Sequence, residues 1–224
     1  MFITVLHNTV MEAQMTKPIE GVSEKILACA KEEFLEKGYS DASLRTIAAK
    51  ADTTTGSIYS RFGGKEGLFS AIVKPAAEEF TNIFLKYQQD FHNMDADKQA
   101  DSLSEYSSSG MMELLDYMYE YFEEFQLLLD ASYGTKFQNF VEHLAEIETE
   151  YTYKFMNALQ SQDGDADKNT QKVPEEFIHI MTRARFESFF EVIRHKMEKE
   201  AAVQYIELQE KFHYNGWKSI LNFK

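Results

Sequence analysis

Residues 43–69 read SLRTIAAKADTTTGSIYSRFGGKEGLF, and this stretch decides the fold of the N-terminal part of the chain. A hydroxyl residue followed by apolar residues at helical spacing predicts a short helix to about Ala51. Asp52-Thr53-Thr54 predicts a turn, a second short helix follows over Thr55–Phe62, and Gly63-Gly64 ends it. Two such helices bury little surface alone and need a third as a platform, as in a helix-turn-helix DNA-binding domain.

A longer helix on either side is expected to supply that platform. Upstream, the sequence predicts a helix over Ser23–Lys37, with an apolar stripe that reaches Phe34 and with Gly38 as its terminating residue. Downstream, a helix should begin near Lys65 and continue to about residue 90, with a kink near Pro75. The flanking helices therefore complete an N-terminal helical domain.

The exposed face of the second short helix is the first candidate binding surface. Ile58 is expected to face the core, because it continues the apolar helical spacing of this domain. The opposite side then carries hydroxyls, one phenol and one glycine, supplied by Thr55, Gly56, Tyr59 and Ser60. Such a surface permits close approach to a DNA groove and hydrogen bonds to phosphates or base edges.

Cations and free backbone N–H groups flank this face. Arg61 lies one helical turn from Ser57, at the edge of the exposed side. Lys65 combines a positive charge with the unbonded N–H groups of a helix start, which suits a phosphate. Ser43 is expected to cap the first short helix, whose N-terminus can meet another phosphate.

The pattern resembles the N-terminal domain of the TetR/AcrR family of transcriptional regulators. The motifs that carry the resemblance are Phe34, Gly38-Tyr39, Ser43-Leu44-Arg45-Thr46-Ile47-Ala48, Gly56-Ser57-Ile58-Tyr59, Phe62 and Lys65-Glu66-Gly67-Leu68-Phe69. By this resemblance Thr46 and the second short helix contact DNA, and Lys65 contacts the backbone. The complete set of expected DNA-binding residues is Ser43, Thr46, Thr55, Gly56, Ser57, Tyr59, Ser60, Arg61 and Lys65.

The chain departs from the family pattern at several positions. Asp52 stands where a glycine is common, and its side chain suits a turn with unusual backbone angles. Thr55 replaces a frequent lysine or small polar residue, Arg61 a frequent aromatic, and Gly63-Gly64 a more polar pair. These departures leave an alternative open, a helical protein-interaction module of the same fold that has lost DNA binding.

The charge is distributed unevenly along the chain. The net charge is −14, yet the Lys, Arg, Asp and Glu residues of 22–74 sum to +1 and those of 75–224 sum to −14. An acidic body repels DNA, so only the N-terminal domain is expected to approach it. This distribution of charge argues against a protein that coats DNA without sequence specificity.

The body is rich in aromatic residues and methionine, particularly over residues 111–160 and 174–197. The resemblance implies an effector pocket among these helices, although such stripes are also typical of plain core. Tyrosines offer polar groups within an apolar lining, and the acidic body favours a lipophilic or cationic aromatic effector. The candidate effector-binding residues are Tyr117, Met118, Tyr121, Phe122, Phe155 and Phe186.

The last two predicted helices, over about 174–199 and 201–221, carry broad apolar faces. By resemblance they pair with the same helices of a second copy, and the alternative is packing within one chain. The candidate residues of the dimer interface are Phe189, Phe190, Ile193, Tyr205 and Trp217. A homodimer places two recognition helices about 34–36 Å apart, which suits a palindromic operator in double-stranded DNA.

The sequence gives little support to other classes of protein, such as enzymes or metal-binding proteins. The six histidines are scattered without metal-ligand spacing, and Asp163–Asp167 fails as a calcium loop because Lys168 replaces the required glycine. No phosphate-binding glycine loop or nucleophile elbow is present, so we expect neither an enzyme nor a cofactor nor a metal. One cysteine, Cys29, and no apolar run of roughly 18 residues fit a cytoplasmic protein outside the membrane.

The sequence therefore predicts an all-α protein in three parts. Residues 1–21 form a disordered tail, 22–68 the helix-turn-helix domain, and 69–224 the effector-binding and dimerisation domain. Within the last, 92–110 is a loop or a poorly packed helix, 111–129 is a buried helix, and 161–173 is a linker. The expected function is a dimeric, ligand-responsive repressor of the TetR type that a small-molecule effector releases from its operator. An activator of the same fold is a further alternative.

Overall fold

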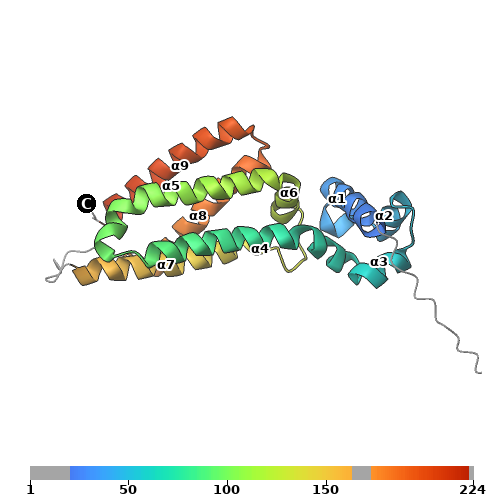
Figure 1. Ribbon diagram of the computed structural model, residues 1–224, viewed down its shortest axis with the longest axis horizontal. Helices are drawn as coiled ribbons and strands as arrows, with labels where there is room; N and C mark the ends of the chain where they lie inside the picture. Colours follow the sequence, from blue (N-terminus) through green and yellow to red (C-terminus); the bar gives the residue numbers. More distant parts are fainter. Residues whose placement is uncertain (1–20, 163–172, 222–224) are drawn as a thin grey trace, which may run out of the picture.

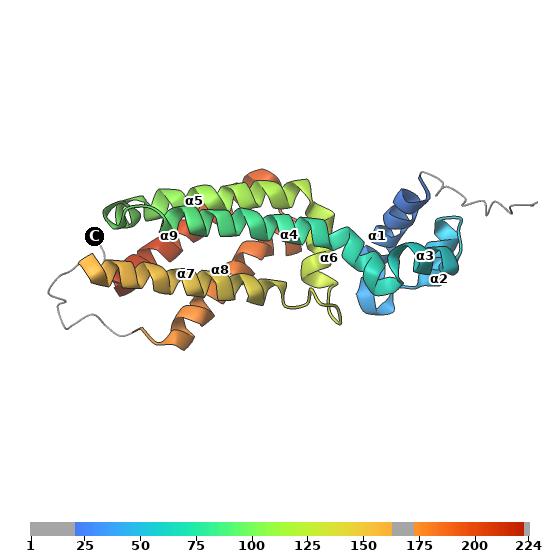
Figure 2. The same cartoon turned by 60° about the horizontal axis from the view of Figure 1, so that its bottom comes forward.

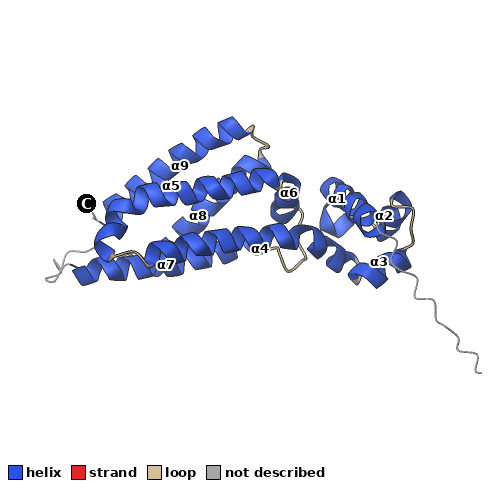
Figure 3. Ribbon diagram, in the orientation of Figure 1, coloured by secondary structure: helices blue, strands red, loops and turns tan. Residues whose placement is uncertain are grey.

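The computed structural model describes residues 21–162 and 173–221, and within these ranges every regular element is an α-helix (Figure 3). The all-α prediction is thereby confirmed. The helices are α1 (Val22–Asp41), α2 (Leu44–Lys50), α3 (Thr55–Phe62), α4 (Lys65–His92), α5 (Ala96–Glu120), α6 (Phe122–Asp130), α7 (Phe140–Gln162), α8 (Glu175–Arg194) and α9 (Lys199–Leu221).

The molecule is elongated, with α1–α3 at one end and the longer helices at the other (Figures 1 and 2). The helix α4 begins beside α3 and continues into the body, where it contacts α5, α6 and α7. Within the body, α7 packs mainly against α8, and α5 packs against α9. Residue 68, the boundary expected between the domains, therefore falls inside one continuous helix.

The four N-terminal helices share a small core. Ile26, Phe34, Ile47, Ile58 and Leu68 are all fully buried, and they come from each of the four helices in turn. Because α2 and α3 each contribute only one or two buried side chains, neither is stable without α1 and α4. This arrangement confirms the platform predicted from the sequence.

The structure decides two expectations about the helices. Residues 92–110 were expected to be a loop or a poorly packed helix, and they are mostly helical because α5 starts at Ala96; Ser104 and Ser107 border a cavity and not a filled core. Residues 111–129 are not one helix, because Tyr121 leaves the helical conformation (φ −116°, ψ 42°). The break turns α6 towards α1, where Lys31 binds Glu124 at 2.6 Å.

The remaining connections are placed as follows. The helix α4 continues through Pro75 and ends at His92. The expected linker over 161–173 lies almost wholly outside the described residues, as does the expected N-terminal tail. No helix in the described part of the chain is long and apolar enough to cross a membrane.

A cluster of phenylalanines fills the body where α4, α6, α7 and α8 meet. Phe80 contacts Phe125, Phe140 and Phe190 at centroid distances of 5.3, 5.9 and 5.7 Å, and Phe189 packs on Phe190 at 5.5 Å. Edge-to-face and tilted ring contacts of this kind add stability beyond the burial of apolar area. The cluster is the packed core of the body at the end where α6 lies, which is the end nearer to the N-terminal domain (Figure 1).

Candidate functional site: DNA-binding surface and internal cavity

Both short helices of the N-terminal domain are capped by hydroxyl side chains. The Oγ atom of Ser43 accepts a hydrogen bond from the backbone N–H of Thr46 at 3.4 Å, and Oγ1 of Thr54 accepts one from Ser57 at 3.1 Å. Asp52, in the turn between the helices, has a φ of 55°, a conformation that Asp tolerates better than most residues. The departure from glycine at this position is therefore compatible with the helix-turn-helix geometry.

The helix α3 presents the face that the sequence predicted. Tyr59 is 59% exposed, Gly56 and Ser60 are exposed, and Ile58 is fully buried on the opposite side. Thr46 is exposed on α2, and Thr55 and Ser57 are half-buried. These side chains thus form one continuous polar surface over the N-terminal turns of α3, the part of a recognition helix that reads base edges.

The two cations beside this surface are already engaged within the protein. Arg61 donates to Ser57 Oγ at 3.3 Å and to Ser23 Oγ at 3.1 Å. Lys65 donates to the carbonyl oxygen of Ser40 at 2.8 Å and lies 4.9 Å from the centre of the Tyr39 ring. Both must exchange these contacts, or share them, to bind a phosphate.

Two glycines that follow the recognition helix are required by close packing. A Cβ atom at Gly64, where φ is 116°, would lie 2.9 Å from Cε1 of Tyr59. A Cβ atom at Gly67 would collide with the carbonyl oxygen of Phe62. Gly67 belongs to the Lys65–Phe69 motif, and a glycine inside an otherwise helical pattern was the signal in the sequence for this close packing.

A cavity of about 130 Å³ lies in the other half of the body, between α4, α5, α7, α8 and α9. Aromatic side chains form a large part of its wall, among them Tyr87, Phe91, Tyr151, Phe155 and Trp217. A concave site with an apolar, aromatic lining and a few polar groups is the usual form of a small-molecule pocket.

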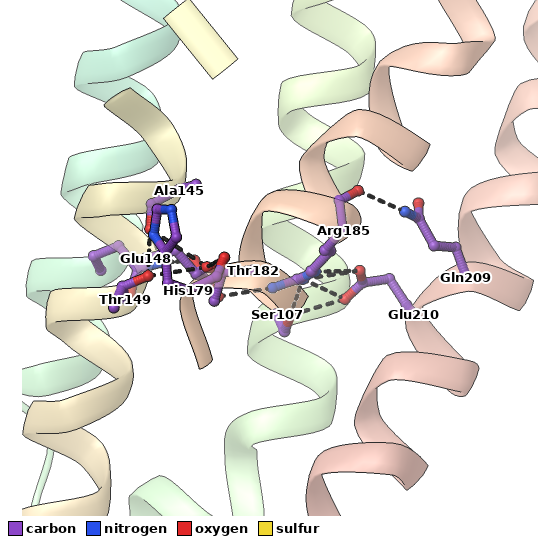
Figure 4. A network of polar contacts seen from close by, with 10 residues as sticks. Ser107, Ala145, Glu148, Thr149, His179, Thr182, Arg185, Gln209 and Glu210 are labelled. Atoms are coloured by element: carbon purple, nitrogen blue, oxygen red, sulfur yellow. Dashed lines mark hydrogen bonds and ion pairs between the residues drawn. The ribbon is translucent and has the colours of Figure 1, made fainter. Parts of the chain in front are cut away.

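A charged cluster forms one wall of this cavity (Figure 4). Arg185 on α8 donates to Glu210 on α9 at 2.8 and 2.9 Å and to Glu148 on α7 at 2.9 Å. Burial alone lowers the pKa of Arg185, but the two carboxylates outweigh it and raise that pKa above its usual value. Burial raises the pKa of Glu148 more than Arg185 lowers it.

His213 borders the same cavity and carries no charge at neutral pH. Burial lowers the pKa of His213 to about 4, and the nearby positive charge of Arg185 lowers it further than Glu210 raises it. The described residues hold no cluster of His, Cys, Asp and Glu suited to a metal ion. Glu148, Arg185 and Glu210 are thus the carboxyl and guanidinium groups of the cavity wall.

The structure separates the residues predicted to bind an effector. Only Phe155 of that set borders the cavity. Met118 and Phe186 are fully buried in the core, and Tyr117 stacks near Tyr121 at 4.8 Å, away from the cavity wall. Phe122 packs beside Tyr119 at 5.5 Å and does not border the cavity either.

The residues predicted for the dimer interface are also distributed differently. Phe189, Phe190 and Ile193 are fully buried within one chain, so they offer no surface to a second copy. The hydroxyl of Tyr205 bonds Ser188 at 2.6 Å, and Trp217 borders the cavity. The exposed apolar side chains of α8 and α9 are instead Ile180, Leu208 and Phe212, at 60%, 67% and 72% exposure.

The charged cluster was missed in the sequence, although a signal existed. Arg185 lies three residues after buried Thr182 and four before buried Phe189, so it falls on the apolar stripe of its helix. Charged residues are almost never fully buried unless they are paired. A charge on a buried stripe therefore predicts partners on neighbouring helices, but the sequence does not say which ones.

These features define a helix-turn-helix domain followed by a second, cavity-bearing helical domain. Residues 26–72 match the family model of bacterial regulatory proteins, tetR family, and no curated protein sequence matches the chain significantly. The N-terminal domain is therefore similar to that of the tetR family, and the match does not extend into the body.

Solved structures are similar to the whole chain in fold. A TetR-like transcriptional regulator from Rhodococcus sp. RHA1 shares 18% identity over 89% of this chain and 99% of its own, with a TM-score of 0.57. The TetR family regulator PfmR from Thermus thermophilus shares 17% identity over 84% and 92%, with a TM-score of 0.53. A transcriptional regulator from Aquifex aeolicus shares 18% over 86% and 99%, with a TM-score of 0.51.

Proposed function

We propose that the protein is a repressor that binds a palindromic operator as a homodimer in the cytoplasm and is released from it by a small-molecule effector. The observation that carries this proposal is the combination of a capped, exposed recognition helix with an aromatic cavity on one connecting helix, α4. The helix α4 contributes Leu68 to the core of the N-terminal domain and Phe91 to the cavity wall.

The proposed DNA contacts come from α2, α3 and the start of α4. Tyr59 and Thr46 are exposed and project from adjacent helices, as expected for contacts to base edges or sugars. Lys65 and Arg61 supply positive charge once they exchange their internal partners. The remaining proposed contacts are Ser43, Thr55, Gly56, Ser57 and Ser60.

Dimerisation is proposed through the outer faces of α8 and α9. Ile180, Leu208 and Phe212 are large apolar side chains with more than half of their surface exposed. A second copy that covers them removes apolar area from water, which is the main favourable term in association. Two symmetric copies also double the number of DNA contacts.

The proposed effector response passes from the cavity to α1 through contacts of α4 and α6. Lys31 of α1 lies 2.6 Å from Glu124 and 3.2 Å from Glu123 on α6. Phe69 of α4 packs between Tyr39 and Phe137 at 5.3 and 6.3 Å. A ligand that shifts α4 or α6 therefore changes the position of the N-terminal domain.

The test is selection of bound duplexes from a random DNA pool, at roughly physiological salt, with the full-length protein. We expect enrichment of a palindrome and an affinity that falls by roughly 0.9 log units per phosphate contact for each log unit of salt. A folded dimer that enriches no sequence contradicts the proposal and favours the protein-interaction alternative.

A further inference from the structure

The charges of the cavity wall do not cancel. Two carboxyl groups, those of Glu148 and Glu210, share one guanidinium, that of Arg185, and the described residues of the wall include no other Asp, Glu, Lys or Arg. The wall therefore carries an excess of one negative charge when both carboxyl groups are ionised. A buried charge without a partner is costly, so a positive group that enters this cavity is favoured.

Arg185 is almost fully engaged and offers little to an incoming anion. Its Nε donates to Glu210 at 3.2 Å, its Nη1 donates to Glu148, and its Nη2 donates to Glu210 and to Ser107 Oγ at 2.8 Å. A guanidinium has five N–H donors, and these contacts occupy most of them. An anionic ligand would have to displace one carboxylate and would add to the negative excess.

The excess charge lies at Glu148 and not at Glu210. Glu210 binds Arg185 through both carboxylate oxygens and also accepts a hydrogen bond from Ser107 at 2.8 Å. Glu148 receives one bond from Arg185 and one from the neutral amide of Gln88 at 2.6 Å. The raised pKa of Glu148, caused chiefly by burial, agrees with this weaker compensation.

The rest of the wall suits an apolar or aromatic body. Tyr151 and Phe155 follow Glu148 along the same helix, three and seven residues on, and both border the cavity. Phe91 packs on Phe155 at 5.7 Å, and Trp217 closes the wall from α9. Aromatic faces also attract a cation that lies over them, which reinforces the preference for positive charge.

We propose that this cavity binds an amphipathic organic cation of single charge, with its ammonium group hydrogen-bonded to Glu148 and its apolar body against the aromatic wall. This assignment of a ligand class rests on the proposed function only in taking the cavity as the effector site. It makes Glu148 a specificity-determining residue and Arg185 the residue that positions it.

The probes are three compounds that differ only in their terminal group, namely phenylhexylamine, phenylhexanol and phenylhexanoate. The chain has one tryptophan, Trp217, which borders the cavity, so binding to the full-length protein is followed by its fluorescence and checked by calorimetry. We expect the amine to bind at least about tenfold more tightly than the alcohol, and the carboxylate most weakly. Equal or tighter binding of the carboxylate, or no binding of any probe, overturns the proposal.

A charge-neutral variant tests the role of Glu148. In Glu148→Gln the advantage of the amine over the alcohol should fall by about tenfold while the alcohol still binds, and Glu148→Asp should restore part of it. The matched control is Glu150→Gln on the same helix, which removes an exposed carboxylate paired with Lys154 outside the cavity wall. An unchanged preference in Glu148→Gln overturns the assignment, and the ranking of the three probes on the native protein tests it even if that variant fails to fold.

Measurement of operator release in the presence of each probe distinguishes failure of this inference from failure of the proposed function. Amine binding at Glu148 that leaves operator affinity unchanged supports the ligand class and contradicts the effector response. Release of operator by the carboxylate and not by the amine supports the effector response and contradicts the ligand class.

Discussion

Tyr39 donates its backbone N–H to the carbonyl oxygen of Ala131 at 3.2 Å, and this hydrogen bond joins the N-terminal domain to the segment after α6. Gly38, whose φ is 73°, interrupts the helical conformation of α1 immediately before this bond. On the same side, Lys31 pairs with Glu124 and Glu123. The N-terminal domain is therefore held by α6 as well as by α4, and these contacts give the proposed effector response two routes to α3.

Loss of the α1–α6 ion pair should weaken the coupling between ligand and operator. We expect Lys31→Gln to lower the free energy of unfolding by less than about 1 kcal/mol, because the pair is partly exposed. The ratio of operator affinities with and without a releasing ligand should shrink by more than the small loss of unfolding free energy suggests. The reason is that the Lys31 ion pair then no longer holds α1 to α6. The ratio is measured by fluorescence anisotropy of labelled operator.

The control for that change is Lys37→Gln, whose ion pair with Glu36 lies between neighbouring residues of α1. Both variants lose one positive charge from α1, so a general electrostatic effect on DNA binding appears in both. Equal coupling ratios in the two variants would show that the α1–α6 pair transmits nothing.

Substitution of Gly67 should destabilise the N-terminal domain. An alanine Cβ would collide with the carbonyl oxygen of Phe62, which is backbone and cannot move aside alone. We expect Gly67→Ala to cost about 1–3 kcal/mol of unfolding free energy, the usual range for overpacking. Thermal and urea unfolding measure it. Gly56→Ala is the control, since its Cβ would meet only Thr54 Oγ1 at 3.7 Å, and equal stability of the two variants would contradict the expectation.

Removal of the Tyr59 ring should weaken operator binding without harm to the fold. Tyr59 is 59% exposed and lies over Gly64, so Tyr59→Ala removes little core packing. We expect a loss of about 1–3 kcal/mol in operator affinity, as for one good base or sugar contact, with the salt dependence unchanged. The control is Tyr133→Ala, which removes a tyrosine that is 81% exposed in the connection between α6 and α7. An operator affinity equal to that of the control would remove Tyr59 from the DNA contacts.

The sequence was sufficient to predict the N-terminal domain because its determinants are local. Hydroxyl caps such as Ser43, the turn at Asp52 and terminating glycines act within a few residues, and the apolar spacing of Ile58 fixes which face of α3 is buried. The bounds predicted for α3 agree with the structure for the same reason.

The cavity could not be predicted because its determinants lie far apart in the chain. Arg185 is 37 residues from Glu148 and 78 from Ser107, and nothing in the local pattern pairs them. A stripe of aromatic residues has the same spacing whether it fills a core, as Phe189 does, or borders a cavity, as Phe155 does. The serine-rich start of α5 was left open between a loop and a poorly packed helix for the same reason, since small residues beside a cavity resemble a polar connection.

A charge on the outer face of α9 should prevent dimerisation. Phe212 is 72% exposed in the single chain, and a second copy is proposed to cover it. We expect Phe212→Glu to shift the protein towards monomer at micromolar concentration, because burial of an unpaired carboxylate is costly. Analytical ultracentrifugation measures the shift. Tyr133→Glu places the same charge on another exposed aromatic, in the α6–α7 connection, and an equal shift there would contradict an interface on α9.

The stability of the body should fall in weak acid because of His213. Burial holds the pKa of His213 at about 4 in the folded protein, against an ordinary value of 6.5, so the unfolded chain binds a proton between these pH values that the folded chain does not. Stability contributed by the neutral ring is thus complete above pH 6.5 and declines as the pH falls towards 4.

We expect His213→Asn to reduce the fall in unfolding free energy between pH 6.5 and pH 4 by about 1–2 kcal/mol. This figure is smaller than the full pKa shift implies because the ring is partly exposed. Urea unfolding at a series of pH values measures the difference between the native and variant curves, so carboxyl groups that titrate in both proteins cancel. His143→Asn, an exposed histidine of α7, is the control and should follow the native curve. Parallel curves for His213→Asn and the native protein would mean that His213 is not kept neutral by the cavity wall.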